Sequence, residues 1–189
     1  ATHQWFASVD KFKDLALSEI SKVKWYPERV INRISSMVQE RSDWCISRQR
    51  SWGLPIPVFY YRESGDVFIN KDTIKKIIDI FNNKGSSAWW ELNVEDLLPD
   101  EYKDQADSLV KGEDTLDVWF DSGSSWKSVL IKDNNYPADL YLEGNDQHRG
   151  WFQSSLLTSV SINQIAPYKA VLTHGFVVDG KGQKMSKSK

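Results

Sequence analysis

The sequence predicts an α/β fold that has a parallel sheet and a small inserted subdomain. Two short apolar runs, at 138–142 and 168–173, flank an amphipathic helical pattern from about 147 to 163. A strand, a helix and a strand in such close succession form a βαβ unit, whose two strands are parallel. Helical patterns precede this unit, and residues 62–112 differ from the rest of the chain in composition and residue pattern.

The composition indicates a globular domain without a membrane partner. Of the 189 residues, 40% are hydrophobic, which is enough for a buried core. The 24 basic and 26 acidic residues give a net charge of −2, so any contact with nucleic acid must be local. A single cysteine, Cys45, excludes an internal disulfide and a Cys-rich zinc site. No stretch approaches the ~18 consecutive apolar residues of a membrane span.

Residues 1–61 are predicted to form helices and an edge strand. The apolar side chains of residues 8–22 fall on one helical face. Pro27 suits the first position of a second helix, whose apolar stripe extends to Val38. An extended segment follows at 44–60, and its two prolines restrict it to an edge or an irregular strand.

Residues 62–112 are predicted to form the inserted subdomain, and residues 113–189 the βαβ half of the fold. The insertion contains a candidate helix at 73–81, a Gly-Ser break at 85–87 and an acidic stretch. The chain ends inside a charged segment, which indicates a piece of a larger protein.

The two strands of the βαβ unit point to one candidate site. Because a right-handed crossover joins them, both end at the same edge of the sheet, at Glu143-Gly144 and at His174-Gly175. Open parallel sheets bind ligands at the carboxyl ends of their strands. Glycine at both ends lets a ligand approach the backbone, and the N-terminus of the intervening helix favours negative charge there.

Each of these patterns also has a simpler interpretation. Glu143, Asp146 and His148 are as consistent with hydrogen-bonding and capping roles as with a metal cluster or an acid–base set. Trp119 and Trp151 are of a residue type that ordinarily lies in a core, and the chain has nine tryptophans. None of these signals decides the function by itself.

The C-terminal run KMSKSK contains two lysines three residues apart, Lys184 and Lys187. After the turn-prone residues 179–182, their ammonium groups are placed to grip a polyphosphate, although charge alone favours a solvated basic tail. The stretch 175–181 nearly matches a P-loop, but Gly182 stands where a Ser or Thr would hold magnesium. The preceding Val-Val-Asp-Gly sequence predicts a hairpin instead.

Taken together, the motifs closely resemble those of the isoleucyl-tRNA synthetases, a family of class I aminoacyl-tRNA synthetases. The resemblance covers nearly the whole chain and is carried by WCISRQRSWGLPIP at 44–57, DTLDVWFDSG at 114–123, LEGNDQHRGWF at 142–152 and HGFVVDGKGQKMSKS at 174–188. Valyl and leucyl enzymes share the KMSKS-type loop but are not expected to have these DVWFDSG and EGNDQHRGWF sequences.

This resemblance implies a fold and also shows what the chain lacks. The implied fold is the second half of a Rossmann-like catalytic domain, from after the editing insertion to the KMSKS loop. The family's His-x-Gly-His motif does not occur in the sequence. The editing and anticodon-binding parts are also missing.

The resemblance further implies part of an isoleucine–tRNA ligase, which activates isoleucine with ATP to isoleucyl-adenylate and transfers it to tRNA(Ile). ATP with Mg²⁺ is then the substrate complex, and no protein-bound metal is expected. The implied partners are isoleucine, ATP, tRNA(Ile) and the remainder of the synthetase chain. The implied compartment is the cytoplasm, or the mitochondrial matrix for an organellar form. The isolated chain is expected to be inactive, and the alternative is a non-catalytic remnant that binds tRNA or a partner.

The same resemblance implies roles for individual residues. Lys184 and Lys187 resemble the catalytic lysines that stabilise negative charge as pyrophosphate leaves, and Trp119 and Trp151 resemble the walls of the isoleucine pocket. The implied contacts to ATP or the adenylate are Glu143, Gly144, Asp146, Gln147, His174, Gly175, Met185, Ser186 and Ser188. Such chemistry depends on positioning and charge neutralisation, so it needs no covalent nucleophile.

Overall fold

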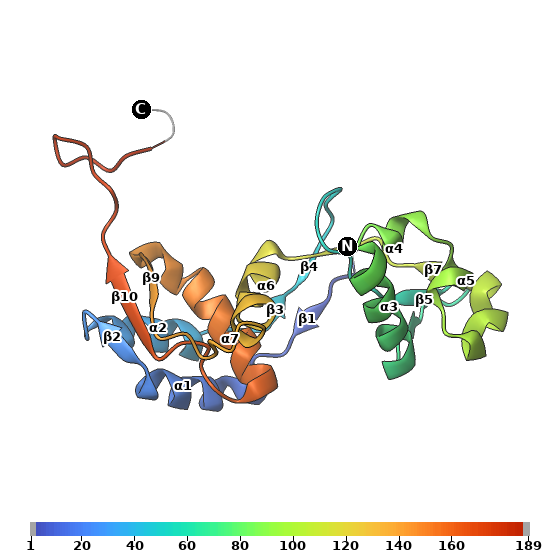
Figure 1. Cartoon of the computed structure of the whole chain (residues 1–189), viewed down its shortest axis with the longest axis horizontal. Helices are drawn as coiled ribbons and strands as arrows, with labels where there is room; N and C mark the ends of the chain where they lie inside the picture. The colour runs from blue at the N-terminus through green and yellow to red at the C-terminus, as the bar shows by residue number, and fades with distance from the viewer. Residues whose placement is uncertain (1–2, 187–189) are drawn as a thin grey trace. The chain divides into compact units, whose positions relative to one another are not determined.

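The computed structural model describes residues 3–186, which form two compact units (Figure 1). Unit 1 combines His3–Ile46 with the chain from Val118 onward, and unit 2 is Ser47–Asp117. The predicted insertion, 62–112, lies within unit 2, which begins earlier and ends later. Each unit has its own hydrophobic core.

Unit 1 contains a sheet of three parallel strands in the order β2-β10-β9. The strands are β2 (Lys24–Tyr26), β9 (Tyr141–Gly144) and β10 (Ala170–His174). Because the register pairs Gly144 with His174, the carboxyl ends of β9 and β10 meet at one edge of the sheet. The predicted parallel strand pair and α/β fold class are therefore confirmed. The sequence did not predict β2, because three residues are too few to show strand periodicity.

The helices of unit 1 share one hydrophobic core with this sheet. They are α1 (Lys13–Lys22), α2 (Val30–Gln39), α6 (Val118–Gly123) and α7 (Trp151–Asn163), with the 3₁₀ turns η1 (Asp10–Phe12) and η4 (Asn145–His148) and the π-helical η3 (Trp126–Ile131). A short antiparallel pair, β1 (Phe6–Ala7) and β3 (Trp44–Cys45), completes the unit. The core includes Ile20 from α1, Ile34 from α2, Leu156 from α7 and Val171 from β10.

The starts of three helices in unit 1 differ from the sequence prediction. The first α-helix, predicted from residue 8, begins at Lys13, after the η1 turn. The crossover helix α7 begins at Trp151 and not near residue 147, because the η4 turn and Gly150, at φ −117° and ψ −120°, precede it. Pro27 is not the first residue of α2, but its carbonyl accepts a hydrogen bond from the Val30 amide in the turn that leads into the helix. All three differences arise where a tight turn precedes a helix.

The crossover helix is buried on more than one face. All nine residues from Phe152 to Val160 are buried, including polar ones. Several of their polar groups are satisfied inside the unit: the Thr158 hydroxyl donates to the Gly123 carbonyl at 2.7 Å, and the Ser159 hydroxyl donates to the Ile165 carbonyl at 2.7 Å, whereas the buried Ser155 hydroxyl has no hydrogen-bond partner. These hydrogen bonds explain why a helix this polar can be buried.

Unit 2 is built from short strands and one long helix. Its strands pair antiparallel as β4 (Ser47–Arg48) with β8 (Thr115–Leu116), and as β6 (Val67–Phe68), β5 (Phe59–Tyr61) and β7 (Leu109–Lys111) in the order β6-β5-β7. Its helices are α3 (Lys71–Lys84), α4 (Ala88–Glu91), α5 (Val94–Leu97) and the 3₁₀ helix η2 (Asp100–Ser108).

The predicted helix at 73–81 corresponds to α3, which has clear signals at both ends. Asn70 and Thr73 form a capping box at its start, with the Thr73 amide donating to the Asn70 side chain at 2.9 Å. Gly85 ends it at φ 82°, a conformation that favours glycine. Across residues 3–186, no helix is long and apolar enough to cross a membrane.

Candidate functional site

The carboxyl ends of β9 and β10 form the centre of the candidate site. Glu143 is exposed and pairs in register with Thr173, whereas Gly144 is buried beside His174. A Cβ atom at Gly144 would lie 2.7 Å from Asp146 Oδ1 and 3.8 Å from His174 Cε1. The structure thus brings Gly144, Asp146 and His174 together at this edge, as their order in the sequence predicted.

The η4 turn connects this edge to the start of α7. Gln147 Oε1 accepts a hydrogen bond from the Trp151 amide at 2.9 Å, so its side chain caps the helix. Gln147 Nε2 donates to Asp146 Oδ2 at 3.3 Å. Asp146 and Gln147, two of the polar side chains expected to contact the adenylate, therefore hold each other in place.

Trp119 and Trp151 lie on opposite sides of this turn in the sequence but close to it in space. Trp119, on α6, is 43% exposed, and its ring lies 2.9 Å from where a Cβ of Gly150 would be. The Trp151 indole stacks in parallel on the Tyr141 ring, and its Nε1 donates to the Ser122 carbonyl at 2.9 Å. Trp119 thus has an accessible face, while Trp151 is held by contacts of a core type.

His148 is buried below the turn. Its Nδ1 lies 2.9 Å from the Asn145 carbonyl oxygen, which can only accept, so Nδ1 carries the proton. Its ring makes an edge contact with Phe152, and its Nε2 has no hydrogen-bond partner. Burial lowers the pKa of His148; the contact with the Asn145 carbonyl opposes this, Arg33 adds a smaller lowering effect, and Asp146 opposes it more weakly still. His148 is therefore a neutral structural histidine that shapes the turn.

This environment makes stability depend on pH. Because the pKa of His148 is lower in the folded chain than its usual ~6.5, the unfolded chain binds more protons near and below that pH. The stabilisation is thus complete above about pH 6.5 and declines as the pH falls. We expect the melting temperature of the chain to fall more between pH 7.5 and 5 than that of a His148→Gln variant, measured by circular dichroism. Parallel pH profiles would contradict this.

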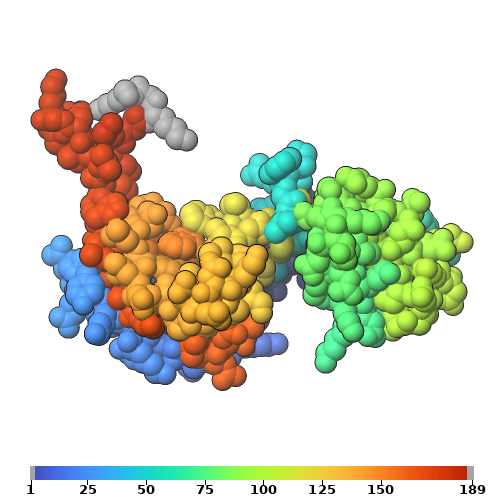
Figure 2. Space-filling model, viewed as in Figure 1, coloured from blue at the N-terminus to red at the C-terminus, as the bar shows by residue number. Residues whose placement is uncertain are grey.

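The residues that precede Lys187 form the predicted hairpin. Val178 and Lys184 make an antiparallel bridge, and the Asp179 carboxylate accepts hydrogen bonds from the Lys181 and Gln183 amides at 2.9 Å each. Figure 2 shows this segment standing out from the rest of unit 1 beyond the end of β10. The hairpin confirms that this stretch is not a P-loop.

The site residues on the hairpin are placed by backbone and ring contacts. The Lys184 ammonium lies 3.6 Å from the centroid of the Phe176 ring, a cation–π contact. The Met185 amide donates to the Val177 carbonyl at 3.0 Å, and the side chain of Met185 is exposed, as is Ser186. Lys187 and Ser188 lie outside the described residues. Gly175, just before the hairpin, has open space around its Cα.

Two residues of this region were not singled out from the sequence. Gly150 is a point of close approach, because a Cβ there would lie 2.5 Å from Gln147 Oε1 as well as against Trp119. The signal for it was a glycine directly before two aromatic residues. Tyr141 supports Trp151 from β9, and an aromatic residue in a short strand gives no signal that separates this role from ordinary packing.

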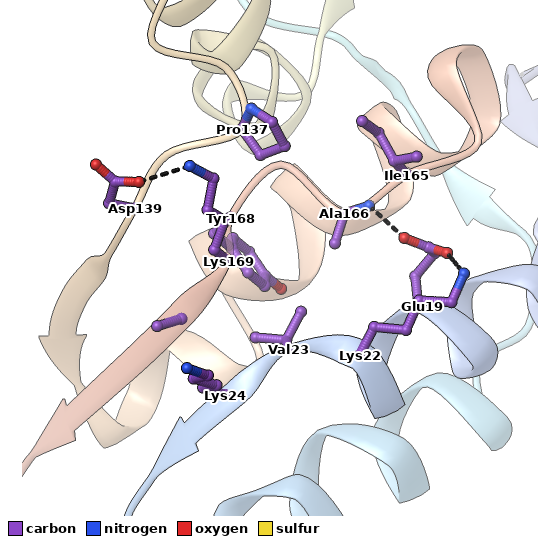
Figure 3. Close-up of a pocket in the computed structure, with 11 residues that line it drawn as sticks. Glu19, Lys22, Val23, Lys24, Pro137, Asp139, Ile165, Ala166, Tyr168 and Lys169 are labelled. Carbon is purple, nitrogen blue, oxygen red and sulfur yellow. Dashed lines mark hydrogen bonds and ion pairs between the residues drawn. The ribbon is translucent and has the colours of Figure 1, made fainter.

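A groove of about 610 Å³ lies at the opposite, amino edge of the same sheet (Figure 3). Figure 3 shows two charged contacts at its walls. Lys169 pairs with Asp139 at 2.7 Å, and the buried Glu19 accepts from the Ala166 amide at 3.0 Å while pairing with Lys22. The sequence did not predict this groove. Its charged groups largely neutralise one another, which distinguishes it from the glycine-lined carboxyl edge.

The described part of the chain contains no group of three His, Cys, Asp or Glu side chains arranged to hold a metal ion. Glu143, Asp146 and His148 therefore do not form a metal cluster in this structure. Hydrogen bonding within the turn accounts for Asp146 and His148.

Known proteins resemble this chain throughout its length. The family model for tRNA synthetases class I (I, L, M and V) matches residues 1–189. Isoleucine–tRNA ligases from Crocosphaera subtropica, Nostoc sp. and Prochlorococcus marinus are 65%, 64% and 63% identical over 190 residues, which cover all of this chain. The chain spans about one fifth, 20%, of the length of these relatives.

A solved structure resembles the fold at lower sequence identity. It is a LeuRS from Agrobacterium radiobacter in a ternary complex with tRNA and LeuAMS, with a TM-score of 0.51 and 23% identity. The match covers 78% of this chain and 21% of that one. At this identity the likeness supports the fold alone.

Proposed function

Because the chain belongs to the class I tRNA synthetases, we propose that it is the second half of the catalytic domain of an isoleucine–tRNA ligase. The whole enzyme would activate isoleucine with ATP and transfer it from isoleucyl-adenylate to tRNA(Ile), in the cytoplasm. The observation that carries the proposal is the meeting of Gly144, Asp146 and His174 where β9 and β10 end.

The geometry of this edge suits the binding of an adenylate. Gly144 has no side chain to fill the space in front of Asp146 and His174, so a ribose and phosphate could approach the backbone. The start of α7 lies nearby and favours negative charge. ATP would arrive as its magnesium complex. The lysines of the C-terminal segment would neutralise charge as pyrophosphate leaves, which is the main task of a protein in this reaction.

The two tryptophans would provide the apolar walls for isoleucine. Trp119 presents a partly exposed ring beside Gly150, and Trp151 follows directly in α7. Isoleucine is favoured over the other amino acids of the family because isoleucine–tRNA ligases are 61–65% identical to this chain over its full length. A non-catalytic remnant that binds tRNA or a partner would have no need for the close fit around Gly144 and Gly150.

The proposal can be tested by ATP–pyrophosphate exchange in a full-length protein that contains this chain. Exchange would be measured with isoleucine, leucine, methionine and valine in turn. We expect the highest kcat/KM with isoleucine, and no exchange above background for the 189-residue chain alone. Preference for another amino acid, or no exchange with any of them, would refute the proposed function of the whole protein.

Substitution of the two tryptophans distinguishes a role in the isoleucine pocket from a role in the hydrophobic core. Trp119→Ala in the full-length protein should lower kcat/KM for isoleucine by roughly 10–200-fold or more, chiefly through KM, because even a single methylene in an apolar pocket is worth about 1–3 kcal/mol and the indole is larger. Trp151→Ala should do the same and also lower the melting temperature, because it removes the stack on Tyr141. Trp52, which is 93% exposed, offers a matched control. Unchanged isoleucine kinetics in both variants would assign the tryptophans to structure alone.

A further inference from the structure

Tyr141 and Trp151 form an unusually close ring pair. Their centroids are 4.0 Å apart and their planes differ by 5°, whereas Trp44 and Phe120 in the same unit are 5.9 Å apart and tilted by 49°. Aromatic pairs more often lie 4.5–7 Å apart in offset or edge-on arrangements. One face of the Trp151 indole is therefore covered by Tyr141.

A second contact fixes the edge of the same indole. Trp151 Nε1 donates to the Ser122 carbonyl at 2.9 Å and approaches the Ser125 hydroxyl at 3.3 Å. Both acceptors come from α6 and the residues just after it, the element that also carries Trp119. A stacked face and a bonded edge together leave the indole little freedom to rotate.

Tyr141 is itself held from the core side. It is only 4% exposed, and its ring lies 4.8 Å from that of Tyr168. The Tyr168 hydroxyl donates to the Phe152 carbonyl at 2.9 Å, so this supporting ring is anchored to α7. The position of Trp151 is thus set by a chain of rings that begins in the core.

The hydroxyl of Tyr141 contributes less than its ring to holding Trp151 in position. It is buried, facing Ser155 and Ser125, and makes no hydrogen bond of normal geometry. Burial raises the pKa of Tyr141, so the phenol remains neutral. Removing a buried hydroxyl that lacks a good partner is nearly neutral, which makes phenylalanine a suitable replacement.

We propose that Tyr141 is a positioning residue for the isoleucine pocket: its ring holds the Trp151 indole in the plane that closes one side of the pocket. The proposal rests on the proposed function and goes beyond it by assigning specificity to a residue that does not touch the amino acid. Discrimination between isoleucine and valine should depend on this stack, because it determines how much space the side chain finds.

The test compares Tyr141→Leu with Tyr141→Phe in the full-length protein, measuring kcat and KM for isoleucine, valine and ATP. Tyr141→Leu should raise KM for isoleucine and reduce the isoleucine-to-valine preference by roughly 10-fold each, the loss expected for one aromatic pair. KM for ATP should stay unchanged, and Tyr141→Phe should stay close to wild type. Tyr141→Met serves if the Leu variant does not fold, because methionine adapts to irregular core space.

A stability control separates positioning from general damage. Val171→Ala removes two fully buried methyl groups from β10, so it should lower the melting temperature and leave the isoleucine-to-valine preference intact. Provided that the wild type activates isoleucine, either of two results would overturn the positioning role. One is an unchanged isoleucine-to-valine preference in Tyr141→Leu, and the other is an equal loss of that preference in Tyr141→Phe. A wild-type protein that does not activate isoleucine would overturn the proposed function first, and the pocket role with it.

Discussion

Replacing Lys187 by alanine in a full-length protein that contains this chain should slow the formation of isoleucyl-adenylate by roughly 10²–10³-fold, the usual loss for one preorganised electrostatic contact. Binding of isoleucine should be nearly unaffected, because the lysine would act on phosphate charge that develops during the reaction. The measurement is single-turnover adenylate formation at saturating ATP, magnesium and isoleucine.

The hairpin gives this prediction its structural basis. Asp179 closes the turn and the bridge between Val178 and Lys184 fixes the returning strand, so the motif starts from an ordered segment. Lys184→Ala should also slow the reaction, and because the two lysines are only three residues apart in the sequence, their effects should not simply add. Lys189→Ala provides the matched control. Equal rates for wild type and Lys187→Ala would show that this run is only a basic tail.

The second large effect is expected at Gly150. A Cβ atom there would lie 2.5 Å from Gln147 Oε1 and 2.9 Å from the Trp119 ring, so Gly150→Ala must displace both. Gln147 would lose its position as the cap of α7, where it accepts from the Trp151 amide. Misplacement of about 1 Å near a reacting centre can cost 10²-fold. We therefore expect kcat/KM for isoleucine in exchange to fall by about 10²-fold.

A glycine in unit 2 provides a control for the strain that an added methyl group causes in a tight space. A Cβ at Gly112 would lie 3.0 Å from the Val58 carbonyl oxygen, so Gly112→Ala is also a tight substitution. It should lower the melting temperature and leave the isoleucine kinetics close to wild type. If Gly150→Ala changed only the melting temperature, in the manner of Gly112→Ala, the turn before α7 would be a packing element and no part of the site.

The fold around the site was predictable because strong local signals agreed with the topology. Two apolar runs on either side of a helical pattern require a parallel pair, and the structure places Gly144 beside His174 as that topology demands. The start of α7 was missed by four residues, because the cap is formed by the side chain of Gln147, a residue type that sequence patterns also accept inside a helix.

What could not be predicted depends on contacts between residues far apart in the sequence. Strand β2 joins the sheet only through pairing with β10. The role of His148 follows from its burial between aromatic rings, which its neighbours in the sequence do not reveal. Tyr141 and Trp151 are separated by a turn and a helix start, so their stacking depends on the tertiary structure.

The sheet of unit 1 offers two places for a ligand, and the proposed function depends on which one is used. The carboxyl edge has Gly144 and Gly175, where a ligand could reach the backbone. The amino edge has the groove of about 610 Å³ beside Lys24 and Lys169. An adenylate at the amino edge would leave the hairpin lysines without a role.

The most direct test is a crystal structure of the full-length protein with a non-hydrolysable analogue of isoleucyl-adenylate. We predict that the adenosine lies against Gly144 and Gly175 and that the isoleucine side chain lies between Trp119 and Trp151. An analogue bound in the groove beside Lys24, or bound at the carboxyl edge with its side chain away from both tryptophans, would contradict this account.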